Sequence, residues 1–182
     1  MQSMLFVKPP QFQGQAWHQD EIYIPTRDRS LIGGWIALDD ATVENGCLWI
    51  LPGSHRMGYL YPQKPHTNLD EFDYAEESYG FDDSKEIPVE VKAGSVVFFH
   101  GYMLHRSRKN RSKIYRRVLV NHYCNAWSLL PWEMKKDERP ANADYRCIIP
   151  VSGVDPYAWK GYEKGKNVWI RTCKAIEEKQ KE

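Results

Sequence analysis

Long apolar runs, paired cysteines and an excess of charge are all missing from this sequence. No apolar stretch approaches the roughly 18 residues of a membrane helix, and no basic segment precedes an apolar one near Met1, so neither a membrane helix nor a secretory signal is indicated. The net charge of +1 gives no general attraction to nucleic acid or to an anionic membrane. Four cysteines lie far apart without a CxxC pair, namely Cys47, Cys124, Cys147 and Cys173. This spacing argues against structural zinc and favours reduced thiols in a cytoplasmic protein.

Aromatic residues, proline and glycine are plentiful instead. The chain has 7 Trp, 11 Tyr, 6 Phe, 11 Pro and 12 Gly, a composition that favours strands and turns over long helices. Its 182 residues suit one domain, residues 1–182, with a well-buried core. Acidic residues gather over 70–83 and basic residues over 106–117. The default expectation for each cluster is a solvated face, and a cosubstrate site or nucleic-acid patch is the minority one.

Seven short strands separated by turns are predicted. They cover residues 3–7, 17–24, 31–38, 47–51, 87–91, 95–104 and 115–123. Without regular alternation of strands and helices, this order favours a mainly β protein, with a double-sheet jelly roll as the natural candidate and a few peripheral helices, one over residues 168–178. The polar segment 54–86 is expected to be a lid or an insertion, and residues 124–182 a C-terminal extension.

One short motif and one distant histidine suggest a metal site. On a strand over residues 17–24, His18 and Asp20 share a face because side chains alternate with period two. With His105 they can form the 2-His-1-carboxylate facial triad of non-heme iron oxygenases. Taken alone the motif is weak, since an acid follows two places after some histidine with a chance of about one half at this charged content. A solvated strand end or a hydrogen-bonded core histidine explains it equally well.

A hairpin centred between Asn110 and Arg111 would place Arg116 directly opposite His105, with Ser107 on the same face. A guanidinium there can hold a carboxylate in a bidentate grip. The alternatives are that Arg116 is a rim residue of a basic hairpin, or that a slip of one residue gives the role to Arg117. His122 shares the parity of Arg116, and for it a core histidine is the expectation.

The motifs together resemble those of a known family. They are Met4-Leu5-Phe6-Val7-Lys8-Pro9-Pro10, Trp17-His18-Gln19-Asp20, Trp35-Ile36-Ala37-Leu38-Asp39, Asn45-Gly46-Cys47-Leu48, Leu51-Pro52-Gly53-Ser54-His55, Gly94-Ser95-Val96-Val97-Phe98-Phe99-His100, Leu104-His105-Arg106-Ser107 and Tyr115-Arg116-Arg117. In order and spacing the chain resembles the phytanoyl-CoA dioxygenase family of Fe(II)- and 2-oxoglutarate-dependent oxygenases. The resemblance implies a cupin-like jelly roll, or double-stranded β-helix, with the metal in its mouth.

The resemblance also implies roles for single residues. His18, Asp20 and His105 would ligate Fe(II), and Arg116 and Ser107 would bind the distal carboxylate of 2-oxoglutarate. Met4, Gln19 and Trp35 would line the cosubstrate pocket, whereas His55 would be structural or shape the substrate mouth. The implied reaction hydroxylates an unactivated C–H bond of a small organic substrate with dioxygen, releases succinate and CO2, and uses ascorbate to maintain the iron.

Two further points stay open. Family members usually carry more strands and helices upstream, so the resemblance implies a jelly roll shortened at its N-terminus, with an open sheet edge that favours self-association. The competing hypotheses are a catalytically inactive or fragmentary jelly-roll binding protein of the same family, and a cupin-type metal enzyme that does not use 2-oxoglutarate. The sequence selects neither the substrate nor the oligomeric state.

Overall fold

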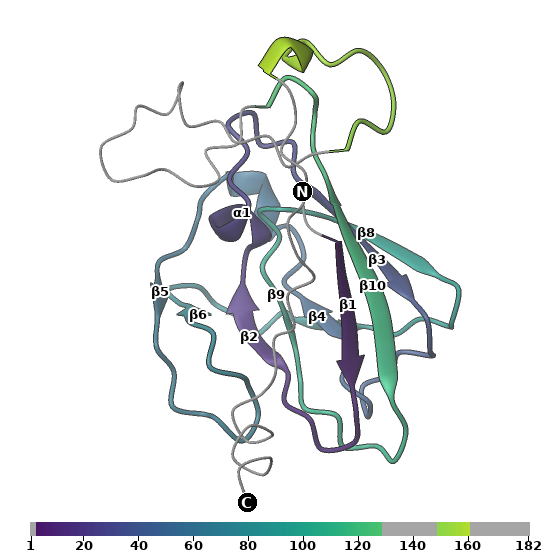
Figure 1. Cartoon of the computed structure of the whole chain (residues 1–182). Coiled ribbons are helices and arrows are strands. Elements are labelled where there is room, and N and C mark those ends of the chain that lie inside the picture. The colour runs from purple at the N-terminus through teal and green to yellow at the C-terminus, as the bar shows by residue number, and fades with distance from the viewer. Residues whose placement is uncertain (1–2, 129–148, 161–182) are drawn as a thin grey trace, which may run out of the picture.

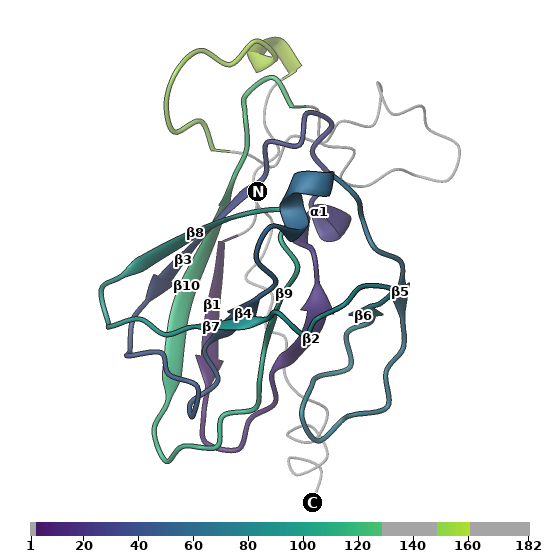
Figure 2. The same cartoon turned by 180° about the vertical axis from the view of Figure 1, so that it is seen from behind.

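Two four-stranded antiparallel sheets face each other in the computed structural model, which describes residues 3–128 and 149–160 (Figures 1 and 2). The first sheet has the order β1 (Ser3–Lys8), β10 (Arg116–Tyr123), β3 (Ile32–Ala37), β8 (Val96–His100). The second has the order β2 (Gln15–His18), β9 (His105–Ser107), β4 (Leu48–Ile50), β7 (Ile87–Val89). Among these eight strands, those that follow one another along the chain belong to opposite sheets, except for β4 and β7. This winding confirms the predicted jelly roll.

The core lies between the sheets and follows the alternation of the strands. Along β10, Val118 and Val120 point inward and pack with Trp35 of β3 and Phe99 of β8. The same parity turns Arg116 and His122 into the interior, where both are buried. Two polar side chains in an otherwise apolar row need partners inside the protein, and they mark the interior that holds the candidate site.

The strand expected over residues 17–24 is wrong in its second half. Strand β2 ends at His18, and Asp20 begins the short helix α1 (Asp20–Tyr23). The buried carboxylate of Glu21 accepts hydrogen bonds from the backbone N–H and the hydroxyl of Thr26, and the Glu21 N–H donates to the Gly101 carbonyl. These bonds replace a sheet ladder in this stretch, so Asp20 is not placed by strand alternation.

The hairpin expected between His105 and Arg116 is also wrong. Strand β9 pairs with β2 and β4, whereas β10 pairs with β1 and β3. Residues 108–115 cross from one sheet to the other, and the fully buried Asn110 fixes the crossing by donating to the carbonyls of Lys8 and Ile114. His105 and Arg116 therefore belong to opposite sheets. The predicted strand at 47–51 is β4 and lies in the second sheet, between β9 and β7.

Residues 51–86 connect the paired strands β4 and β7. They contain η1 (Ser54–Met57) and a small pair of strands, β5 (Gln63–Lys64) and β6 (Glu77–Ser78). The acidic and basic clusters are not two separate solvated faces, because they pair with each other: the ion pairs are Asp70–Lys109, Glu71–Arg111, Asp83–Arg106, Glu86–Arg106 and Glu86–Arg108. The last part of the segment also meets β2, since the Trp17 indole donates to Asp83 at 3.1 Å. Ion pairs thus hold this segment against the second sheet.

The remaining expectations concern the ends and edges. The helix expected over 168–178 lies outside the described residues, and of the extension 124–182 the structure describes 124–128 and 149–160, with η2 (Ala158–Lys160). Strands β1 and β8 form the edges of the first sheet, where Leu5 and Phe98 are exposed. In residues 3–128 and 149–160, no helix has the length and apolar character to cross a membrane.

Candidate metal centre

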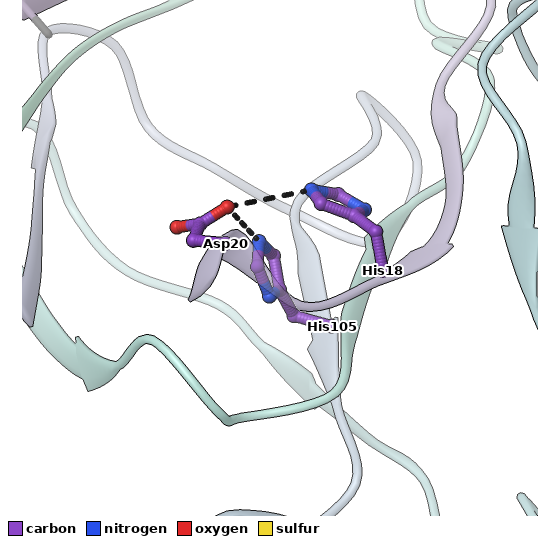
Figure 3. A group of neighbouring side chains, drawn as sticks. All are labelled: His18, Asp20 and His105. Carbon is purple, nitrogen blue, oxygen red and sulfur yellow. Dashed lines mark ion pairs between the residues drawn. The ribbon is translucent and has the colours of Figure 1, made fainter. Parts of the chain in front are cut away.

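Three side chains from three elements converge at one end of the interior. His18 ends β2, Asp20 begins α1, and His105 begins β9 as the register partner of His18. The Asp20 Oδ1 atom lies 3.8 Å from His18 Nε2 and 3.6 Å from His105 Nε2, and the three ligand atoms lie within 4.8 Å of one another. Figure 3 shows the side chains pointing toward a common centre. The structure therefore brings the predicted triad together.

Backbone carbonyls fix which nitrogen of each ring is free. His18 Nδ1 lies 2.8 Å from the Ala16 carbonyl, and His105 Nδ1 lies 2.9 Å from the Met103 carbonyl. A carbonyl can only accept, so each Nδ1 carries the hydrogen and each Nε2 presents a lone pair toward Asp20. Metal-binding histidines commonly donate their other ring N–H in this way.

The electrostatics of the cluster favour a cation. Burial, followed by the neighbouring His105, lowers the pKa of His18 to about 4, so this ring is neutral at pH 7. Burial acts to raise the pKa of Asp20, but His105, the hydrogen bond from His122 and His18 together lower it well below the ordinary value. A carboxylate beside two ring lone pairs leaves a buried negative charge without a cation, and a divalent metal ion satisfies it.

His122 belongs to the site and was not predicted as such. Its Nε2 donates to Asp20 Oδ2 at 2.9 Å, and both groups are buried. This bond holds one carboxylate oxygen and leaves Oδ1 facing the two histidines. The available signal was the alternation of β10, which points His122 to the same side as Arg116. That alternation indicates the direction of the side chain but not its partner, Asp20.

Arg116 lies in the same interior without a counterion. Its side chain is 3% exposed, its guanidinium lies 5.8 Å from the ring centre of Trp35, and its Nε has no hydrogen-bond partner. No carboxylate among the described residues forms an ion pair with it. Burial lowers the pKa of Arg116 to about 10, so it remains charged at pH 7. A buried, unpaired cation is costly, and an anionic ligand would remove that cost.

Ser107 and Lys8 adjoin this cation. Lys8 is the register partner of Arg116, and its ammonium donates to Ser107 Oγ at 3.1 Å. The backbone N–H of Gln15 also donates to Ser107 Oγ, at 3.2 Å. Lys8 was missed, although it follows Met4 and Phe6 on the inward face of β1. A lysine in that alternation is the signal that could have found it.

The other predicted residues have distinct places. Gln19 is fully buried, and its amide donates to the carbonyls of Tyr59 and Tyr102 and accepts from the Tyr61 N–H. Met4 lies inward opposite Val120, and Trp35 is buried beside Arg116. His55 lies in η1 and stacks on His100 with ring centres 5.7 Å apart, outside the ligand cluster.

Comparison with known proteins agrees with this geometry. The family model described as phytanoyl-CoA dioxygenase (PhyH) matches residues 1–118. The chain belongs to the phytanoyl-CoA dioxygenase family. Phytanoyl-CoA dioxygenase 1 of Oryza sativa subsp. japonica is 38% identical over 143 residues, covering 75% of this chain and 50% of that protein. Phytanoyl-CoA dioxygenase domain-containing protein 1 of Danio rerio is 34% identical over 148 residues, covering 77% and 51%.

Two solved structures share the fold. EvdO2 of Micromonospora carbonacea var. aurantiaca, complexed with 2-oxoglutarate, matches with a TM-score of 0.54 and 28% identity over 69% of this chain and 55% of that one. The non-heme monooxygenase ThoJ matches with a TM-score of 0.59 and 25% identity over 70% and 50%. The chain thus spans about half the length of the phytanoyl-CoA dioxygenase relatives and of these structures.

Proposed function

We propose that this protein is an Fe(II)- and 2-oxoglutarate-dependent oxygenase that hydroxylates an unactivated C–H bond of a small organic substrate, with release of succinate and CO2. The observation that carries the proposal is the convergence of His18, Asp20 and His105 in one interior with the unpaired Arg116. Membership of the phytanoyl-CoA dioxygenase family and the likeness to EvdO2, a structure with 2-oxoglutarate, support it.

The ligand set fits Fe(II). Two imidazole lone pairs and one carboxylate oxygen make a facial triad, which leaves three positions for the cosubstrate and dioxygen. When bound, the iron supplies the reduction of dioxygen, and ascorbate would keep it ferrous. The protein holds the ligands in place through the Ala16 and Met103 carbonyls and through His122.

Arg116 and Ser107 would bind the distal carboxylate of 2-oxoglutarate. The guanidinium offers two parallel N–H donors to a carboxylate, and the Ser107 hydroxyl is buried nearby on the facing sheet. Trp35 and Met4 present apolar surface to the same interior and would exclude water from the chain of the cosubstrate. Gln19 would support the site by fixing the backbone around it.

The substrate would enter beside Tyr23. Its half-exposed ring lies 6.2 Å from the His18 ring, and its hydroxyl accepts from the Gln63 amide at 2.8 Å. Gln63 belongs to the segment 54–86, which we assign as the lid of this mouth. Tyr59 and Tyr61 extend the aromatic surface there, with ring centres 4.8 Å apart. This aromatic mouth suits a small organic substrate.

An anaerobic titration tests the proposal. Adding Fe(II) and 2-oxoglutarate to the protein should give a weak visible charge-transfer band, and the Asp20→Ala/His105→Ala double variant should abolish it. His55→Ala, which removes a histidine outside the ligand cluster, is the matched control and should retain the band. A wild-type protein without the band, or a double variant that keeps it, would refute the assignment. Protein that gives the band but no succinate in air would be a binding protein of the same family.

A further inference from the structure

Two cations lie side by side in the interior, and no described residue places an anion between them. Lys8 of β1 and Arg116 of β10 are register partners on the inward face, and their side chains are 5% and 3% exposed. Directly opposed residues of antiparallel strands have Cβ atoms roughly 4.5–5.5 Å apart. No carboxylate of the described residues forms an ion pair with either one. The charge of Arg116 acts to lower the pKa of Lys8, so the two cations repel each other, and an external anion would offset that repulsion.

The hydrogen bonds of Lys8 show how it acts. Its Nζ donates to the Arg108 carbonyl at 2.7 Å, to Ser107 Oγ at 3.1 Å and to the Gly46 carbonyl at 3.4 Å. Three acceptors around one nitrogen require three N–H groups, which only the ammonium form has. Lys8 therefore bears its charge in this geometry, although its own donors are all engaged by the protein.

The consequence falls on Ser107. A hydroxyl oxygen has two lone pairs, and Ser107 Oγ uses both to accept hydrogen bonds, one from the Lys8 ammonium and one from the Gln15 N–H. Its hydrogen is then left to donate to a further group. A serine held in this way accepts no further hydrogen bond, and it offers a fixed O–H donor beside the Lys8 ammonium.

We propose that Lys8 is a positioning residue for the distal carboxylate of the cosubstrate: it holds the Ser107 hydroxyl as a donor and adds a second positive charge beside Arg116. The inference rests on the proposed function. It predicts a cosubstrate preference: Lys8, Ser107 and Arg116 together favour the binding of a 2-oxo dicarboxylate over that of a 2-oxo monocarboxylate. Burial, followed by the charge of Arg116, holds the pKa of Lys8 well below its usual range, and a bound carboxylate would counteract both effects.

Two cosubstrate analogues separate this role from a structural one. 2-Oxoglutarate and 2-oxopentanoate have the same chain length and chelate iron through the same 2-oxo acid group, but only the first has a distal carboxylate. Their dissociation constants are measured from the visible band of the anaerobic Fe(II) protein. Lys8→Met should weaken 2-oxoglutarate binding about 10- to 100-fold, the value of the charge-assisted hydrogen bond from Ser107 to the distal carboxylate that Lys8 no longer holds in place, and should change 2-oxopentanoate binding less than about twofold. Lys92→Met, at an exposed lysine, should change neither.

The outcomes distinguish the two proposals. Wild-type protein that gives no band with 2-oxoglutarate overturns the proposed function and the inference with it. Wild-type binding of 2-oxoglutarate with an equal loss of both ligands in Lys8→Met, or no loss of either, overturns the inference alone. If Lys8→Met does not fold by circular dichroism, Lys8→Gln takes its place, since it keeps two N–H donors and removes the charge. Failure of both variants to fold would make Lys8 a folding residue and would also overturn the inference.

Discussion

Replacing His122 by phenylalanine should weaken metal binding while leaving all three ligands in the chain. The ring volume is nearly conserved, and the residue opposite on β3 is Gly33, which offers no side chain to collide with it. The change removes the N–H donor that lies 2.9 Å from Asp20 Oδ2. Asp20 is then free to rotate, so that Oδ1 no longer stays between the two histidine nitrogens.

The expected loss of metal affinity follows from the single hydrogen bond between His122 and Asp20. A hydrogen bond to a charged group contributes about 1.5–3 kcal/mol, which limits the loss to about 100-fold in affinity. Loss of an outer partner of a metal ligand typically costs about 10- to 100-fold. We therefore expect His122→Phe to raise the dissociation constant for Mn(II) or Co(II) by about 10- to 100-fold. His122→Asn, which keeps an N–H donor on a shorter side chain, should fall between this variant and the wild type.

The measurement is competition with a chromophoric chelator in the absence of dioxygen. His66→Phe is the matched control, since His66 bonds the Asp73 carbonyl in the segment 54–86 and lies outside the ligand cluster. Its affinity for the metal should equal that of the wild type. If His122→Phe binds the metal within twofold of the wild type and melts at the same temperature, the bond to Asp20 does not orient the ligand and our reasoning is wrong.

Three further outcomes follow from the structure. Gly46→Ala should lower the free energy of unfolding in urea by about 2 kcal/mol or more beyond the loss caused by Gly53→Ala. Both glycines have φ +82°, but only at Gly46 would the new Cβ lie 2.4 Å from a backbone atom, the Arg108 carbonyl oxygen. Equal losses in the two variants would contradict this. In the metal-free protein, the pKa of His18 is about 4 in the folded state against an ordinary 6.5. Neutral His18 therefore contributes about 3 kcal/mol to the free energy of unfolding above pH 6.5, and this contribution is lost as the pH falls through 4. His18→Gln should flatten the dependence of the unfolding free energy on pH between these two values. Burial raises the pKa of Cys47 to about 11, so iodoacetamide at pH 8 should alkylate it in urea and spare it in the native protein, as peptide mass spectrometry would show.

The strands and their buried faces were predictable from the sequence because alternation is a local property. The parity of the strand at 115–123 puts His122 on the same side as Arg116, and the structure buries both residues. Which strands become neighbours is not local. The turn between His105 and Arg116 looks like a hairpin, but the jelly roll sends β9 and β10 to opposite sheets, and the buried Asn110 holds that crossing.

Strand periodicity accounts for only part of the metal triad. Strand periodicity put His18 and Asp20 on one face, yet the strand ends at His18 and Asp20 reaches the site from the first turn of α1. The family motifs, not the periodicity, carried that prediction. Lys8 and His122 were missed because alternation shows that a side chain points inward, whereas its partner comes from an element distant in the sequence: Ser107 of β9 for Lys8, and Asp20 of α1 for His122.

Gln19 separates what must stay constant in this protein from what can change. The hydrogen bonds of its amide are made to main-chain atoms of Tyr59, Tyr61 and Tyr102. These bonds hold the backbone of the mouth against the metal motif and do not depend on the side chains at those positions. Residues 59–61 can therefore vary in identity while the chain keeps its path past the metal motif. For the oxygenase proposed above, this means that substrate preference can change without disturbing the metal centre. Randomised libraries at these positions, built on an intact Gln19, would test that separation.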